Sequence, residues 1–228
     1  MAYIAQLKSL HTLGLSYCHL TDNGLARLAA LRSLSSLQLA LCEDIAVSDL
    51  ARLNVLPQLT QLTLLNCGRQ DNKGLDVSGL TKLKQLSLWL STGSLRDEDL
   101  ACLANLTELE SVNLGPCEQV TDVGAAQLSG LTSLRRLFIT KSPHLTDKSL
   151  SYLENMNALE DLAIEGNFTD EGLRRLEGHK ALTGLEIGSG HDFSRPALER
   201  LAKNLPRLEH FRTYRTSSQP GTVRTPRK

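Results

Sequence analysis

Residues 10–25 read LHTLGLSYCHLTDNGL, and two patterns in this stretch return along the rest of the chain. The first is L-x-x-L-x-L-x-x-C, formed here by Leu10, Leu13, Leu15 and Cys18. The second is the hexamer LTDNGL at the end of the stretch. Because both patterns recur, the chain is best read as a set of repeats before any single motif is interpreted.

The first pattern occurs eight times, with Val or Ile in place of some leucines and Ser, Asn or Gly in place of some cysteines. Its last positions are Cys18, Cys42, Cys67, Ser91, Cys117, Ser142, Asn167 and Gly190. Neighbouring copies are 23 to 26 residues apart, and a partial ninth copy contains Leu208 and Phe211. We expect this last position, named the ladder position here, to be buried in each repeat.

The hexamer keeps the same period independently of the first pattern. It ends at Leu25, Leu50, Leu75, Leu100, Ala125, Leu150, Leu173 and Leu198. Neighbouring endpoints are 25 residues apart, except for one interval of 23. Two patterns that share one period indicate an array of stacked structural repeats.

Each repeat combines a short strand with a short helix. Side chains alternate along a strand, so Leu13 and Leu15 point inward while the residue between them faces solvent. The Thr-Asp of the hexamer offers side-chain oxygens that can cap a helix N-terminus, and Leu25 with Leu28 forms an apolar stripe on that helix. One repeat cannot bury these leucines alone. The sequence therefore predicts an α/β fold: a right-handed horseshoe of about eight repeats, with a parallel sheet on the concave face and short helices on the convex face.

The repeats define the domain organisation. We expect a short N-terminal segment at 1–6, a single repeat domain at 7–215 and a disordered basic tail at 216–228. The tail contains Pro, Gly, Ser and three basic residues but no apolar periodicity, which is typical of disorder.

These motifs resemble the leucine-rich-repeat family, and specifically its cysteine-containing branch, over residues 7–213. That branch is known from F-box substrate receptors and from bacterial and protozoan arrays. The resemblance implies protein binding but does not specify the partner. F-box receptors carry an N-terminal helical F-box, whereas this chain starts directly in a repeat, so the resemblance does not extend to docking on a ubiquitin ligase through an F-box.

Composition argues against several other classes of protein. The chain has 25 basic and 25 acidic residues and only 4% aromatic residues, whereas nucleic-acid binders usually show a basic excess or stacking aromatics. Residues 1–6 have no charged segment followed by a long apolar one, as a secretory signal would. No stretch approaches the ~18 apolar residues of a membrane span. We therefore expect no nucleic-acid partner, no membrane insertion and an intracellular, cytoplasmic location.

The five cysteines are expected to be structural. Cys18, Cys42, Cys67 and Cys117 share the ladder position, where the resembling family uses Cys or Asn to satisfy backbone groups of a turn. The chain has no C-x-x-C pair, so we expect no metal and no cofactor. Cys102 lies outside the ladder, on an expected helix, and is the candidate for the more accessible thiol.

The stretch from Gly188 to Asp192, GSGHD, superficially suggests a nucleophile cluster or a phosphate loop. A Ser-His-acid triad needs three groups that converge in space, which neighbours in one turn do not easily achieve. Neither a G-x-S-x-G nor a Walker motif is present. We therefore expect no catalytic residue and no enzymatic activity.

The outward-facing strand residues supply the candidate binding site. They are almost uncharged in the first five repeats and charged in the later ones. Trp89, the only tryptophan, is either an interface anchor or a ring that lies flat on its neighbours, and the sequence leaves both interpretations open. The candidate protein-binding residues are Leu65, Trp89, Leu90, Phe138, Asp161, Glu165, Glu186, Arg212 and Tyr214.

A competing interface lies at the N-terminal edge, where Tyr3, Ile4 and the first strand could pair with another chain because little polar sequence covers the first repeat. The leading functional hypothesis is a non-catalytic protein-interaction module, a scaffold or accessory subunit of a larger assembly. The alternatives are a substrate-recognition adaptor for a ubiquitin ligase, and a bacterial or protozoan effector that binds a host protein.

Overall fold

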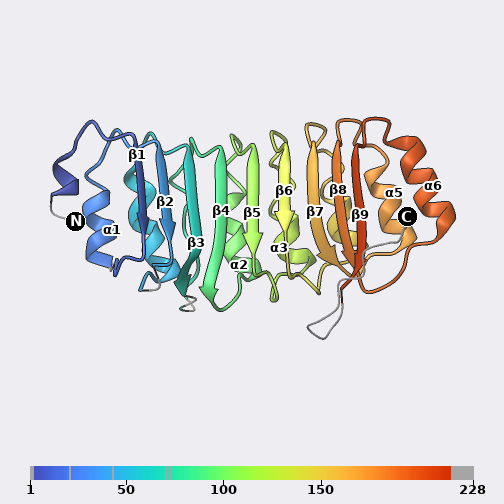
Figure 1. The fold of residues 1–228 in the computed structure, drawn as a ribbon, viewed down its shortest axis with the longest axis horizontal. Coiled ribbons are helices and arrows are strands. Elements are labelled where there is room, and N and C mark those ends of the chain that lie inside the picture. The colour runs from blue at the N-terminus through green and yellow to red at the C-terminus, as the bar shows by residue number, and fades with distance from the viewer. Residues whose placement is uncertain (1–2, 21, 43, 70, 72, 217–228) are drawn as a thin grey trace.

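The computed structural model describes residues 3–20, 22–42, 44–69, 71 and 73–216. Within these residues, nine parallel strands form one open sheet in sequence order (Figure 1). The strands are β1 (Thr12–Ser16), β2 (Ser36–Ala40), β3 (Gln61–Arg69), β4 (Gln85–Thr92), β5 (Ser111–Gly115), β6 (Arg136–Ile139), β7 (Asp161–Gly166), β8 (Gly184–Ser189) and β9 (His210–Arg215). The predicted solenoid is confirmed.

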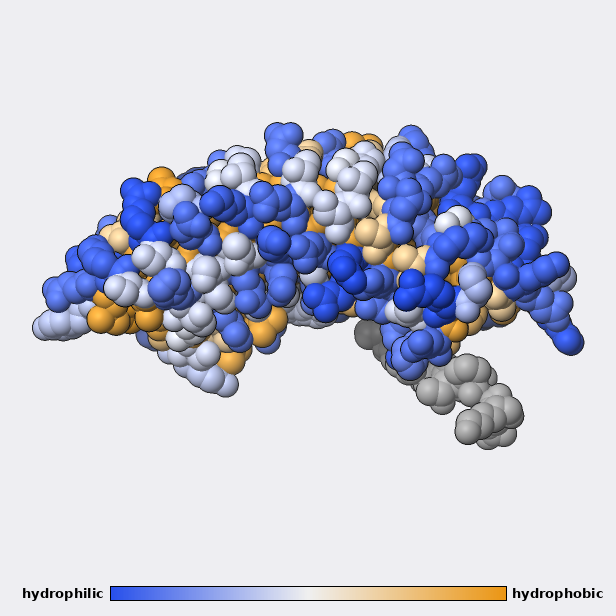
Figure 2. All heavy atoms as spheres, turned by 90° about the horizontal axis from the view of Figure 1, so that it is seen from above, coloured by the Kyte–Doolittle hydropathy of each residue, from blue (hydrophilic) through white to orange (hydrophobic). Residues whose placement is uncertain are grey.

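Short helices lie behind the sheet and connect its strands (Figure 1). The α-helices are α1 (Asp22–Leu28), α2 (Asp97–Leu100), α3 (Asp122–Ala126), α4 (Asp147–Ser151), α5 (Asp170–Leu176) and α6 (Arg195–Asn204). The described part of the chain also contains the 3-10 helices η1 (Ile4–Gln6), η2 (Val47–Val55) and η3 (Ala101–Leu103). Neighbouring strands lie closer together than helices can pack, because a helix is wider than the spacing between strands. The helical side of the array is therefore longer than the strand side. Figure 2, viewed from above, shows the resulting arch, hollow on the side of the strands.

The strand register stacks equivalent leucines into continuous buried rows. One row runs through Leu13, Leu37, Leu62, Leu86, Val112, Leu137, Leu162, Leu185 and Phe211. Its interior members are buried, whereas Phe211 on the last strand is 42% exposed. The predicted strand phase is therefore confirmed, because residues on alternate positions face the core as expected.

The ladder position is buried in four of the eight repeats, and cysteines at this position form hydrogen bonds with the local backbone. Cys42 Sγ donates to the carbonyl of Ala40 at 3.4 Å, and Cys67 Sγ donates to that of Leu65 at 3.3 Å. Just before each of these cysteines, Leu41 (φ 55°) or the equivalent residue enters the left-handed region, which turns the next side chain back into the core. This arrangement matches the expected role of the ladder cysteines in the turn.

In the fourth, seventh and eighth copies, the ladder position predicted from the sequence is wrong by one residue. Leu90, not Ser91, pairs with Cys67 and is buried, while Asn167 and Gly190 are exposed. In these copies no residue enters the left-handed region before the ladder position, so the chain stays extended. Strict alternation then brings the residue one place earlier into the core, as the buried Ser189 shows for the eighth copy.

The aspartate of the hexamer links neighbouring repeats from the fourth repeat to the eighth. Thr169 caps its own helix α5 by accepting from the amide of Glu171 at 3.2 Å, as predicted. The amide of Thr169 donates to Asp147 Oδ1 of the preceding repeat at 2.8 Å, and its hydroxyl donates to Asp147 Oδ2. A Cβ at Gly172 would lie 2.1 Å from Asp147 Oδ1, which explains the glycine of the motif. The same carboxylate bridge joins Asp97 to Thr121, Asp122 to Thr146 and Asp170 to Ser194.

The first repeat is less well covered than the interior ones. Tyr3 is 84% and Leu7 54% exposed, and Ile4, Leu10 and Leu15 are only partly buried. At the other end, the expected tail falls almost entirely on residues 217–228, which lie outside the described residues.

Candidate functional site

The concave face consists of the outward-facing residues of the nine strands, and it divides into two parts. The neutral half, on β1 to β5, comprises Thr12, Gly14, Ser16, Ser36, Gln38, Ala40, Gln61, Thr63, Leu65, Gln85, Ser87, Trp89, Ser111, Asn113 and Gly115. The charged half, on β6 to β9 and on Thr140 directly after β6, comprises Arg136, Phe138, Thr140, Asp161, Ala163, Glu165, Gly184, Glu186, Gly188, His210, Arg212 and Tyr214. This division agrees with the charge distribution expected from the sequence.

The neutral half is rich in hydroxyl and amide side chains, and several of them are not hydrogen-bonded to one another. Ser36 Oγ donates to Gln61 Oε1 at 3.1 Å. Among the described residues, the side chains of Gln38, Thr63 and Ser87 make no hydrogen bond with protein atoms. Their donors and acceptors therefore face solvent and are open to a ligand.

Trp89 lies on β4 with its ring packed over Gly115 of the next strand. A Cβ added to Gly115 would come within 3.2 Å of both Cε3 and Cζ3 of the indole. On the other side Trp89 is in register with Leu65, which is 38% exposed. The ring is thus half-buried and held in place, while Leu65 and Trp89 together present apolar surface on the concave face.

Leu90 was wrongly placed in the candidate site. It is 4% exposed and pairs with Cys67 inside the core. The cause is the continued extension of β4, which directs Leu90 inward when Trp89 points outward. Phe138 is half-buried on the concave face, in register with Asn113 and Ala163, so that β5 separates it from Trp89.

The charged half contains a clamp around Glu165. The hydroxyl of Tyr214 donates to Glu165 Oε1 at 3.0 Å, and the amide of Lys141 donates to Glu165 Oε2 at 3.0 Å. Arg212 places its guanidinium 5.7 Å from the centre of the Tyr214 ring. Burial, and then the negative charge of Glu165, raise the pKa of Tyr214, so the hydroxyl keeps its proton and donates.

A glycine makes room for two of the aromatic rings on the concave face, those of Trp89 and Tyr214. Gly188 lies beneath Tyr214, because an added Cβ would be 2.7 Å from the ring atom Cε2. Gly115 does the same for Trp89. Sequence reasoning missed both glycines, although each one stands at the equivalent position of a strand next to the aromatic residue.

Glu186 differs from Glu165 because it is exposed on the concave face. Its strand neighbours in register are Ala163 and Arg212. Asp161 is half-buried at the start of β7, beside Gly184. The acidic residues expected at the site therefore lie on adjacent strands, but Glu165 is already engaged by other groups of the protein.

All five cysteines are free thiols. Burial is the main cause that raises the pKa of Cys67 and of Cys102 to about 11 and that of Cys117 to about 12. Cys102 is half-buried, but so is the ladder residue Cys18, so the expected contrast between Cys102 and the whole ladder is wrong for Cys18. The described residues include no group of three or more His, Cys, Asp or Glu side chains arranged to hold a metal.

The Gly188–Asp192 stretch has no arrangement suited to nucleophilic catalysis among its described contacts. Ser189 is buried and its hydroxyl donates to the carbonyl of Phe168 at 2.8 Å. His191 is exposed, and Asp192 pairs with Arg215 at 3.3 Å.

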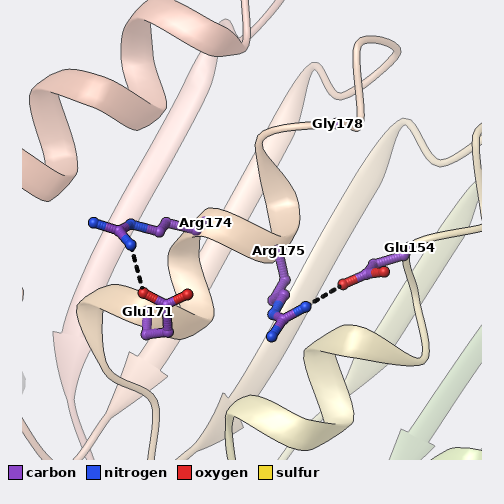
Figure 3. Close-up of a pocket in the computed structure, with 5 residues that line it drawn as sticks. All are labelled: Glu154, Glu171, Arg174, Arg175 and Gly178. Atoms are coloured by element: carbon purple, nitrogen blue, oxygen red, sulfur yellow. Dashed lines mark hydrogen bonds and ion pairs between the residues drawn. The ribbon is translucent and has the colours of Figure 1, made fainter.

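A shallow hollow on the helical side is lined by paired charges (Figure 3). Arg174 contacts Glu171 at 2.8 Å and Arg175 contacts Glu154 at 3.0 Å. Because each of these charges already has a partner, the hollow offers less to a charged ligand than the open concave face does.

The fold and its concave face are those of a leucine-rich-repeat solenoid. No protein-family model matches the sequence. Two internalins of Listeria monocytogenes are similar in structure: internalin C2 is 24% identical with a TM-score of 0.64, covering 90% of this chain and 79% of that one. Internalin inlF is 21% identical with a TM-score of 0.65, covering 92% and 63% respectively.

A plant protein shares the fold as well. The Arabidopsis receptor kinase HAESA, solved with the peptide hormone IDA and the co-receptor SERK1, is 20% identical with a TM-score of 0.56, and the match covers 93% of this chain and 36% of HAESA. At these identities the likeness establishes the fold. No helix in the described part of the chain is long and apolar enough to cross a membrane.

Proposed function

We propose that this protein is a non-catalytic interaction module that binds another protein through its concave face, as a scaffold or an accessory subunit of a larger assembly. The observation that carries the proposal is the apolar pair Leu65 and Trp89, which is partly exposed in the middle of a broad sheet face. Interface hot spots favour tryptophan in partly enclosed, preorganised surroundings, and Gly115 provides such surroundings for Trp89.

The structural likeness supports this proposal, since HAESA was solved with a peptide and a co-receptor bound. A substrate-recognition adaptor for a ubiquitin ligase is the second candidate. It is favoured by the ladder position, which is occupied by cysteine at Cys18, Cys42, Cys67 and Cys117. Cysteine at this position is the feature of the leucine-rich-repeat branch that the sequence resembles. An intracellular location belongs to the same proposal and is supported by the five free thiols, because secreted proteins usually pair their cysteines.

Site-specific photo-crosslinking in the cells that express the protein tests the concave interface. A photoreactive residue is introduced at Ser87 on the concave face, at Glu171 on the helical side or at Leu7 on the N-terminal edge, all in the full chain. We expect a discrete crosslinked partner from Ser87 and none from Glu171. A partner captured only from Leu7 would place the interface at the N-terminal edge and contradict the proposal.

The mass of the crosslinked partner separates the two candidate functions. A ubiquitin-ligase subunit crosslinked from any of the three positions would favour the adaptor. A different protein crosslinked from Ser87 would favour the scaffold.

A further inference from the structure

We propose that the neutral half binds an extended, uncharged segment of a partner polypeptide that runs across β1 to β5 and seats one bulky apolar side chain against Leu65 and Trp89. The inference rests on the proposed function and specifies the chemistry of the partner. It draws on three features of the neutral half: its lack of charge, its open hydrogen-bonding side chains and its fixed tryptophan.

The lack of charge limits what the partner presents. None of the residues that define the neutral half is ionisable, although the equivalent residues of β6 to β9 include Arg136, Glu165 and Arg212. A charged side chain buried against the neutral half would lose water and gain no ionic partner, which costs free energy. The segment that contacts this surface is therefore uncharged.

The open side chains fit a polypeptide backbone. A chain that crosses the strands cannot pair with them as an added strand, because the amides and carbonyls of the interior strands bond their neighbours within the sheet. Its own amides and carbonyls still need partners when they lose water. Gln38, Thr63 and Ser87 each donate and accept, and their side chains make no hydrogen bond to the described protein.

The dimensions suit a short segment. Five strands spaced about 4.8 Å apart span roughly 20 Å, which an extended chain covers with about six residues. A segment of this size bonds several backbone groups and still places one side chain at the centre of the surface.

The apolar anchor is prepared before binding. The indole of Trp89 is packed on Gly115, and Leu65 stands beside it in register. A fixed ring loses little conformational entropy when a ligand binds. The aliphatic Leu65 also distinguishes a peptide from an oligosaccharide, because sugar hydroxyls placed against it would lose water without gaining hydrogen bonds. The pair therefore favours an aliphatic or aromatic side chain.

A display library of random twelve-residue peptides, selected against the full chain, tests the inference. We expect enriched peptides to contain one large apolar residue within a run of about six uncharged residues, as the span of the surface requires. Trp89→Ala and Ser87→Glu should each weaken binding by about tenfold or more, because the first removes the anchor and the second adds an unpaired charge. Glu171→Gln on the helical side is the matched control and should bind like the unmodified protein. Ser87 is at the surface, so its variant keeps the test independent of any effect of Trp89→Ala on folding.

Four results would overturn the inference: no enriched peptide, enriched peptides with a fixed charged residue in the contacting run, peptides that bind the Ser87→Glu variant undiminished, or a neutral oligosaccharide from a glycan array that binds in a Trp89-dependent manner. These results are distinct from failure of the proposed function. A protein partner crosslinked from Ser87, together with failed peptide selection, would leave the concave interface standing and remove only the extended segment.

Discussion

At the scale of single residues, His179 departs most clearly from the repeat pattern. The equivalent position holds Leu131, Met156 and Leu205 in other repeats. His179 is 1% exposed, its Nδ1 lies 3.3 Å from the carbonyl of Met156, and its Nε2 has no hydrogen-bond partner in the described structure. Burial lowers the pKa of this imidazole below its ordinary value, so protonation opposes folding.

Replacing His179 by Leu should therefore stabilise the protein, and more so in acid. The unfolded state binds a proton below about pH 6.5, whereas the folded state takes it up only at lower pH, so the histidine lowers the free energy of unfolding as the pH falls through this range. The gain at neutral pH should be on the order of 1 kcal/mol, because an unpartnered buried polar atom is removed. Urea unfolding at pH 5 and pH 8 measures both effects, with His144→Leu at an exposed position as the control. An equal gain at the two pH values would contradict this explanation.

Lys141 has a strained backbone conformation. Its φ is 53°, a conformation that costs a non-glycine residue about 1–2 kcal/mol. Lys141→Gly should leave stability unchanged or raise it by up to about 1 kcal/mol, since glycine also loses more freedom on folding. Lys148→Gly, on helix α4, should instead lower stability by about 0.5–1 kcal/mol. Thermal unfolding of both variants checks the contrast, and equal destabilisation would argue against strain at Lys141.

At the scale of elements, the repeat pattern could be predicted well and the links between repeats could not. The strand phase follows from alternation, and the Thr169 cap follows from the hexamer. The partner of Asp147 is 22 residues away, in a part of the next repeat that local pattern reading does not connect to it. Similarly, the position of Leu90 depends on whether the chain turns or stays extended after β4, and both outcomes fit the same leucine spacing.

The carboxylate bridge should be one of the stronger links between repeats. Asp147→Ala removes two hydrogen bonds from Thr169 to a charged acceptor, and should lower the free energy of unfolding by about 2–4 kcal/mol. Lys148→Ala on the same helix should change it by less than about 0.5 kcal/mol. Gly172→Ala should be costly in the unmodified protein, because its Cβ would meet Asp147 Oδ1, but much less costly in Asp147→Ala. A double-mutant cycle by urea unfolding measures this coupling, and additive effects would show that Gly172 is not required by Asp147.

At the scale of the whole molecule, the division of the concave face into neutral and charged halves could be read from the sequence, because strand phase fixes which residues face outward. The contacts across that face could not. Tyr214 reaches Glu165, 49 residues earlier, only because Gly188 lies between them without a side chain. Such a contact depends on the direction of the ring and on the small residue beneath it, and neither follows from the repeat spacing.

The clamp around Glu165 gives Glu165 and Glu186, the two glutamates of the concave face, different roles. Reversing the charge of each one should show the difference. Glu165→Lys would place a cation next to the Tyr214 hydroxyl and the Lys141 amide, both of which donate to the present carboxylate. Two donors would lose their acceptor, so the variant should unfold at a lower temperature, with a cost of about 1–3 kcal/mol or more. Glu186 is exposed and has no such role, so Glu186→Lys should leave stability within about 0.5 kcal/mol.

The same pair of variants should differ in binding. With the partner identified by crosslinking, Glu186→Lys should change the association rate and its dependence on salt while leaving the dissociation rate nearly unchanged, because an exposed charge acts mainly by steering the approach of the partner. Surface plasmon resonance over a range of ionic strengths, alongside thermal unfolding, measures both properties on the same protein samples. Equal thermal stability of the two variants would remove the clamp as a structural element. An association rate unaffected by Glu186→Lys at low salt would mean that the charged half takes no part in guiding the partner onto the concave face.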